Sequence, residues 1–338
     1  MLVLVSLLAF VVGFSVHRGT NCSVVAAEQL VRRRDPTRLA SFLVGAAAAM
    51  AIAIPVLWAD PGRFKVATTQ GLTWAAVIGG AGYGLGALLN GACALGTFVR
   101  ISEGRLSFLA AIPGVGIGAT LASGLGLAGY RQAMSPAVMA TPGTGQLAAV
   151  LCAALIAIAA LRATDIHLHR RRIGLRALLR APRWRPMLSM LITGGAGGLA
   201  YILSDAWTWP SLTRRLAEIL GGGPVDLPLP MLLGAASLFA GAFTAASLSG
   251  RFRVRAEGFT QTLRSLFGGT VMGGSAALIP GGNDTLLLQA LPALATSGLI
   301  AYAAMFGVLL PALFVIEQVR AASASDLPGV ASWQSRSP

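Results

Sequence analysis

The stretch "GGAGYGLGALLNGACALGT" (Gly79 to Thr97) contains a glycine-rich apolar run that stops at Asn90 and Gly91. A second stretch, "PGGNDTLL" (Pro280 to Leu287), makes a similar stop much later in the chain. Irregular backbone inside an apolar environment persists only where protein or a watery cavity satisfies its N–H and C=O groups. The two breaks therefore predict either closely packed joints or one shared path through the molecule.

The composition indicates that this environment is a lipid bilayer. The chain has 338 residues, of which 55% are hydrophobic and 11% charged, and its mean hydropathy is +0.72. A soluble protein of this length would need a more polar surface. Many apolar segments approach the roughly 20 residues needed to span a hydrocarbon core. The segments run over residues 1–17, 36–58, 70–89, 104–127, 145–162, 187–204, 229–249, 256–279 and 292–318. The sequence predicts an all-α polytopic membrane protein with about nine transmembrane helices and short half-inserted helices.

The net charge of +14 predicts the orientation of these helices. Arginines gather in short segments between apolar runs, at 32–34, 169–185 and 251–255. This placement matches cytoplasmic loops under the positive-inside rule and argues against nucleic acid as a partner. We expect membrane lipid around the chain, the N-terminus outside and the C-terminus in the cytoplasm.

Two halves of the sequence resemble each other. Residues 79–93 and 268–283 share paired glycines, a glycine-rich span and then a break, and residues 13–23 and 198–208 end matching segments. We expect one membrane domain made of a first repeat (1–127), a linker helix with a basic loop (128–186), a second repeat (187–318) and a C-terminal tail (319–338). Five crossings separate equivalent segments, so the repeats should be inverted, as in many transporters.

Two cysteines occupy comparable positions. Cys22 follows Thr20 and Asn21, and Cys93 follows Asn90-Gly91-Ala92, so each should lie in the first turn of a short helix. Helix N-termini favour anions, which makes both thiols candidates for contact with an anionic solute. The alternative is that they are small inert fillers.

Other candidates leave alternatives open. Asn283 and Asp284 should begin the last half-helix, with Asp284 either a simple N-cap or a functional ionisable group. Arg264 is either paired inside the protein or faces the path. Cys152, in an unbroken apolar helix, should be a packing residue.

Several residues near the expected membrane–water interfaces can also be interpreted from the sequence. His17 and Arg18 are either anchors at the interface or contacts for solute at the inner mouth. Glu28 should pair with Arg32 one helical turn later. The stretch "DAWTWP" (Asp205 to Pro210) reads as an interfacial aromatic belt followed by a short helix.

No enzyme motif is visible. The three histidines do not have the spacing of metal ligands, and no phosphate-binding loop of the Walker type occurs. The sequence predicts a protein that is not an enzyme, with no catalytic residue, metal or cofactor.

Three motifs carry a resemblance to a known family. "HRGTNCSVVAAEQLVRRR" (from His17), "LNGACALGTF" (from Leu89) and "LIPGGNDTLLL" (from Leu278) resemble the motifs of the YeeE/YedE sulphur-transport family of bacterial inner-membrane proteins. The resemblance implies an hourglass-shaped helical body and thiosulfate uptake past cysteine thiols, with a small sulphurtransferase-like protein as cytoplasmic partner. By that resemblance, Cys22 and Cys93 are the thiols that handle the solute.

The resemblance also implies a third cysteine, in a Gly-Cys-Asn context, that this chain lacks. The corresponding residues are Gly281, Gly282, Asn283 and Asp284. We expect these four residues, with Asn90 and Gly91, to complete the substrate path.

The leading hypothesis is a permease or channel-like carrier that imports a small inorganic sulphur anion, with thiosulfate as the favoured substrate. Its alternatives are transport of another sulphur or selenium compound, a membrane sulphur-relay protein acting through Cys22, and a membrane scaffold.

Overall fold

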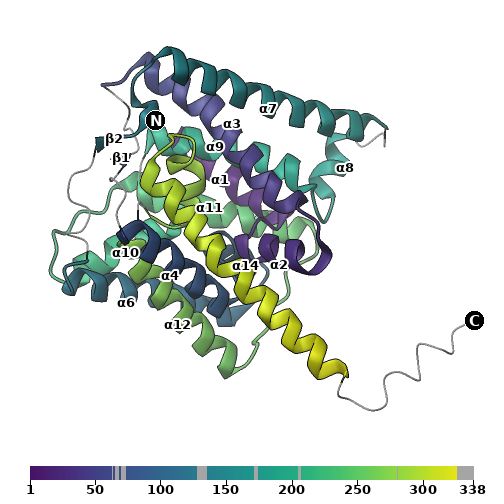
Figure 1. Ribbon diagram of the computed structural model, residues 1–338, viewed down its shortest axis with the longest axis vertical. Helices are drawn as coiled ribbons and strands as arrows, with labels where there is room; N and C mark the ends of the chain where they lie inside the picture. The colour runs from purple at the N-terminus through teal and green to yellow at the C-terminus, as the bar shows by residue number, and fades with distance from the viewer. Residues whose placement is uncertain are drawn as a thin grey trace, which may run out of the picture.

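The computed structural model describes residues 1–62, 64, 68–69, 74–127, 135–170, 174–204, 207–279 and 281–325. Helices make up most of this part of the chain (Figure 1). The first elements are α1 (Leu2–Gly19), α2 (Ser23–Arg33), α3 (Thr37–Ala59), β1 (Thr68–Thr69), α4 (Trp74–Asn90), α5 (Ala94–Ser102), η1 (Leu106–Ala110), α6 (Ala111–Gly124), β2 (Ser135–Pro136), η3 (Val138–Ala140) and α7 (Thr144–Arg170). The remaining elements are α8 (Leu175–Arg180), α9 (Pro186–Leu203), α10 (Trp209–Leu220), α11 (Leu229–Leu248), α12 (Phe259–Ala276), α13 (Asn283–Thr285), η4 (Leu286–Ala290) and α14 (Thr296–Ser325).

Each predicted apolar segment coincides with a long helix. Within the described residues, eight stretches are long and apolar enough to cross a membrane. Helix α12 is the predicted segment that does not reach this hydropathy, because its first two turns read "FTQTLRS" (Phe259 to Ser265). The structure confirms an all-α polytopic membrane protein.

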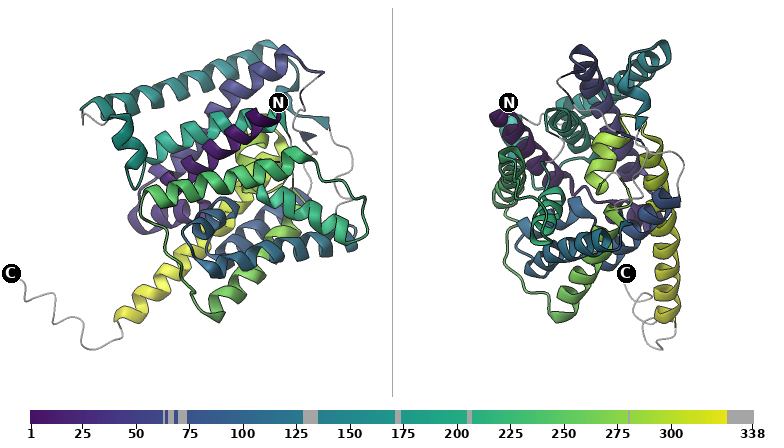
Figure 2. Two further views of the ribbon diagram at one scale, coloured as in Figure 1. Left: turned by 180° about the vertical axis from the view of Figure 1, so that it is seen from behind. Right: turned by 90° about the vertical axis from the view of Figure 1, so that its left-hand side faces the viewer.

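The outer surface of the helix bundle is apolar, as lipid requires. Helix α7 lies at one edge of the molecule against α3 and α9, and Leu151, Leu155 and Ile158 on it are exposed (Figures 1 and 2). Such a continuous exposed apolar surface is unusual for a soluble monomer. The surface therefore fits a chain surrounded by acyl chains.

The long helices pack in related pairs. Helix α1 packs on α11 and α3 on α9, while α6 packs on α12 and α4 on α14. Helices α1 and α9 also touch each other, as do α4 and α12. Exchanging α1 with α9, α3 with α11, α4 with α12 and α6 with α14 turns the first four pairs into one another and leaves the last two unchanged. Inverted repeats at 1–127 and 187–318 would produce such a pattern; the division and its inversion stay predictions.

The molecule has two distinct ends. In Figure 1 the N-terminus, β1 and β2 lie on one side, and α2, α8 and the C-terminal end of α14 lie on the other. The two strands form a short antiparallel ladder in which Thr68 pairs with Pro136. The short helices α2 and α5 start inside the bundle, where the candidate residues lie.

Candidate functional site

The two expected thiols meet at two helix starts. Cys22 is the N-cap of α2 and Cys93 the N-cap of α5, and both are buried. Their Sγ atoms lie 3.6 Å apart. The amide of Cys93 points at Cys22 Sγ (3.5 Å), and the amide of Ser23 points at Cys93 Sγ (3.4 Å). Each thiol therefore accepts a backbone N–H at the start of the other helix, where N–H groups lack helical partners.

The first break satisfies its own carbonyl groups. Asn90 Nδ2 donates to the carbonyl of Ala92 (2.8 Å) and to Thr97 Oγ1 (2.8 Å). Gln261 of α12 donates to the carbonyl of Asn90 (3.2 Å), and Arg100 donates to that of Gly91 (3.1 Å). Because side chains take up these acceptors, the chain can leave helical geometry at Gly91, where φ is +75°, inside the bundle.

The second break lies against the first. Asn283 Nδ2 approaches Cys93 Sγ at 3.7 Å, so the predicted meeting of the two breaks is present in the structure. Gly282 is the N-cap of α13, and the next turn, Leu286–Ala290, is a π-helix. Asp284 is therefore not the N-cap. Its Oδ2 instead accepts a hydrogen bond from the hydroxyl of Tyr201 in α9 (3.0 Å).

Two tyrosines that the sequence analysis missed complete this cluster. The Tyr83 hydroxyl, from α4, approaches the amides of both Asn283 and Ala94, and so joins the two helix starts. Tyr201 is buried and also lies 3.1 Å from Thr285 Oγ1. A buried tyrosine hydroxyl needs a partner, so lone tyrosines inside apolar runs were the available signal.

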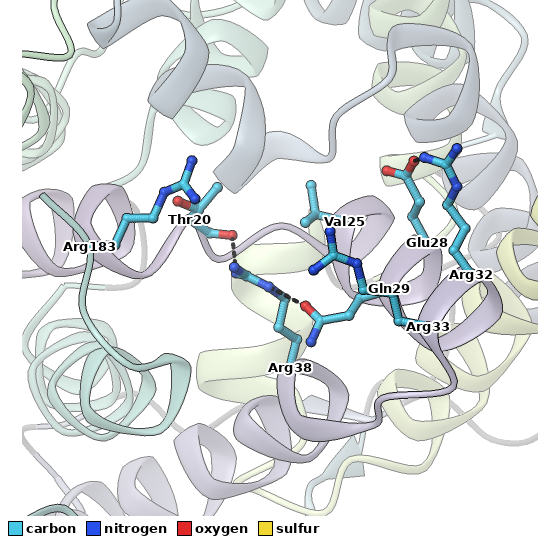
Figure 3. Close-up of a pocket in the computed structure, with 8 residues that line it drawn as sticks. All are labelled: Thr20, Val25, Glu28, Gln29, Arg32, Arg33, Arg38 and Arg183. Atoms are coloured by element: carbon cyan, nitrogen blue, oxygen red, sulfur yellow. Dashed lines mark hydrogen bonds and ion pairs between the residues drawn. The ribbon is translucent and has the colours of Figure 1, made fainter. Parts of the chain in front are cut away.

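A basic vestibule opens on the side of α2 and α8. We use this name for three adjoining cavities of about 310, 380 and 170 Å³ that share Thr20, Val25, Glu103, Arg105, Arg183 and Arg251 among their linings. Figure 3 shows the first, in which Arg38 bonds to the carbonyl of Thr20 and to Gln29. Among the described residues, nine arginines and two glutamates line the vestibule: Arg32, Arg33, Arg38, Arg100, Arg105, Arg183, Arg251, Arg253, Arg255, Glu28 and Glu103. This excess of positive charge attracts anions.

The smallest cavity of the vestibule reaches the thiol pair. Cys22 and Arg100 both line it, and Arg100 also stacks on Phe108, with its guanidinium carbon 4.9 Å from the ring centre. Gly96 lies beside Cys22, because a Cβ at that position would be 2.5 Å from Cys22 Sγ. Cys93 and Asn283 are fully buried behind Cys22.

The structure corrects the prediction for Cys152 and decides between two roles for the tryptophans, which the sequence gave as packing or anchoring at the interface. Cys152 does not pack inside the chain but is exposed on α7. The residues 205 and 206 of the expected aromatic belt lie outside the described part, but Trp207 and Trp209 are buried. Trp207 packs edge-on against Tyr201, and Trp209, the first residue of α10, donates to the carbonyl of Ala94 at the start of α5.

The structure also shows where the charged residues singled out in the sequence lie. Arg18 is buried and donates to the carbonyls of Leu179 (2.6 Å) and Ala181 (2.5 Å), so it joins α1 to the end of α8. His17 is buried 3.6 Å from Glu103, which pairs with Arg251. The predicted Glu28–Arg32 pair is present at 2.9 Å. Arg264 is exposed on α12.

A multi-pass helical body with a basic vestibule that ends at buried thiols and interrupted helices has the architecture of a membrane transporter. The chain belongs to the sulphur-transport family, whose profile matches residues 18–310. The family resemblance drawn from the three motifs is thus confirmed. The chain is also 30% identical over 227 residues to the thiosulfate transporter TsuA of Escherichia coli. That match covers 61% of this chain and 64% of the relative.

Proposed function

We propose that this protein is a bacterial inner-membrane importer of a small sulphur-containing anion, thiosulfate in the first place. The observation that carries the proposal is the contact of Cys22, Cys93 and Asn283 behind a basic cavity. Thiosulfate is a dianion with a polarisable terminal sulphur. S–H groups are weak hydrogen-bond donors, so they can bind this anion and still release it. The sulphur-transport family and the name of the E. coli relative support the same substrate class.

The order of contacts follows from burial. An anion that has passed the buried segment at Asn283 reaches Cys93, then Cys22, and leaves through the vestibule. The substrate path then comprises Cys22, Cys93, Asn90, Gly91, Gly281, Gly282, Asn283 and Asp284. The arginines of the vestibule raise the local concentration of anions at the inner mouth. They also suit docking of an acidic, sulphurtransferase-like protein that consumes the imported sulphur.

Uptake by purified protein in liposomes tests the proposal. We expect radiolabelled thiosulfate to accumulate with wild-type protein and with Cys152→Ala, whose thiol faces lipid. Cys93→Ala should lower the uptake rate about fivefold or more, because one lost hydrogen bond corresponds to roughly 1 kcal/mol. Equal uptake by the two variants would remove Cys93 from the path.

A sulphur relay is the second candidate, because Cys22 borders the vestibule. The Cys22 thiolate would attack the terminal sulphur of thiosulfate, forming an S–S bond to give a persulfide and releasing sulfite. The relay predicts sulfite release and a persulfide on Cys22 in detergent solution, without accumulation in liposomes. Accumulation without sulfite release supports the transporter.

A further inference from the structure

The carboxyl group of Asp284 occupies an unusual position beside the second break. The side chain is 2% exposed, and among the described residues no lysine, arginine or histidine forms an ion pair with it. An isolated carboxylate in such surroundings carries a large desolvation cost, whereas the neutral acid does not. An ionised carboxylate here would also repel an incoming anion.

The two oxygens of this carboxyl have different surroundings. Oδ2 accepts the hydrogen bond of the Tyr201 hydroxyl at 3.0 Å, and the Thr208 hydroxyl and the backbone amides of Asp284 and Thr285 also approach the carboxyl group. Oδ1 is buried and has no hydrogen-bond partner. With Tyr201 donating to Oδ2, we assign the proton of the neutral acid to Oδ1.

Oδ1 points toward the meeting point of the two breaks. A Cβ built on Gly282 would lie 2.6 Å from Oδ1 and 3.2 Å from the Tyr83 hydroxyl. Gly282 is directly followed by Asn283, whose amide approaches Cys93 Sγ. Oδ1 therefore occupies the space that any side chain at position 282 would fill, next to the groups that join the half-helices.

We propose that Asp284 is kept protonated and donates its Oδ1–H to the anion at the second break. The neutral acid thus supplies a hydrogen-bond donor at the second break, as a thiol does at the first break. This inference rests on the proposed function, and it deepens it by adding a pH-sensitive donor to the path. The donor is present when the acid is neutral and is lost as rising pH removes its proton, so transport falls toward alkaline pH.

Few other groups facing Asp284 can contribute to such a profile. The titratable groups around it in the described chain are the phenols of Tyr83 on α4 and Tyr201 on α9, with the thiol of Cys93 behind Asn283. Free phenols ionise near pH 10 and free thiols near pH 8.5. Both kinds of group are present in wild type and in Asp284→Asn, so the difference between these two pH profiles reports Asp284. The Asp284→Asn variant keeps a donor of nearly the same shape but cannot titrate.

Two measurements on purified full-length protein test the inference. The first is thiosulfate uptake in liposomes against pH, for wild type, Asp284→Asn, Asp284→Ala and the surface control Asp165→Asn. We expect wild type and Asp165→Asn to lose activity toward alkaline pH, Asp284→Asn to be active with a flattened profile, and Asp284→Ala to be about tenfold slower at low pH. The same pH profile in wild type and Asp284→Asn would overturn the inference.

The second measurement is infrared spectroscopy, which does not depend on transport. We expect a carbonyl band of a protonated carboxylic acid that shifts when thiosulfate is added and that is missing from Asp284→Asn. Absence of this band, or a band that thiosulfate does not shift, overturns the inference even where uptake is normal. Loss of uptake at every pH in wild type, with the band present and shifted, would instead count against the proposed import and leave Asp284 as an anion-binding donor.

Discussion

The thiols of Cys22 and Cys93 owe their contact to one missing side chain. Gly96 lies on the first turn of α5, and any Cβ there would overlap Cys22 Sγ at 2.5 Å. The sulphur atom thus fills space that the glycine leaves open. This makes the position of Cys22, rather than only its chemistry, open to a direct test.

We predict that Gly96→Ala lowers thiosulfate uptake by about fivefold or more without removing any thiol, since it displaces a hydrogen-bonding group worth roughly 1 kcal/mol. Alanine has a higher helix propensity than glycine, so the substitution should not destabilise helix α5 itself. Uptake in liposomes is the measurement. Gly145→Ala on α7, where a Cβ would meet nothing within 4 Å, is the matched control. Normal uptake by Gly96→Ala would show that the observed thiol geometry is not required.

At the scale of helices, glycines set how closely the paired elements approach. A Cβ on Gly118 of α6 would lie 1.9 Å from the carbonyl oxygen of Thr270 in α12, and one on Gly80 of α4 would lie 2.2 Å from that of Ala301 in α14. Small residues allow such backbone contact between membrane helices. The same kind of contact recurs in the related pairs, which explains why glycine spacing was the sequence feature that the two halves shared.

We predict that Gly118→Ala destabilises the protein by about 1–3 kcal/mol, because α6 and α12 must separate to admit the methyl group. In the same helix, a Cβ on Gly116 would make an ordinary 3.5 Å contact with Thr213. Gly116→Ala should therefore be neutral or stabilising by up to about 1 kcal/mol. Thermal unfolding in detergent compares the two variants. Equal melting temperatures would mean that the helix contact is looser than described.

At the scale of the whole molecule, apolar runs of helical length predicted the long helices, because lipid requires both apolar surface and closed backbone hydrogen bonds. The breaks predicted either closely packed joints or one shared path, and the structure places Asn283 beside Cys93. The sequence could not predict which helix faces turn inward. Cys152 is exposed although it stands in an unbroken apolar run, since in a bilayer apolar residues suit both sides of a helix.

Side-chain clusters that combine distant segments of the chain also could not be predicted from the sequence. The contact between Asp284 and Tyr201 joins residues 83 positions apart, and the vestibule joins arginines of α2, α3, α5 and the segments before α9 and α12. Charge bias predicted that arginines share one side of the membrane. It did not predict that they surround a cavity ending at Cys22.

The side on which the vestibule opens is the last prediction. The arginine bias places α2, α8 and the C-terminal end of α14 in the cytoplasm, and the N-terminus with β2 outside. In a Cys152→Ala background, where Cys22 and Cys93 stay buried, cysteines at the exposed positions Thr141, after η3, and Arg180, at the end of α8, report the two sides. We expect a membrane-impermeant maleimide to label Thr141→Cys in intact cells and Arg180→Cys only after the membrane is opened. The reverse pattern would turn the vestibule into an outer mouth, and its arginines would then collect the anion before transport rather than after it.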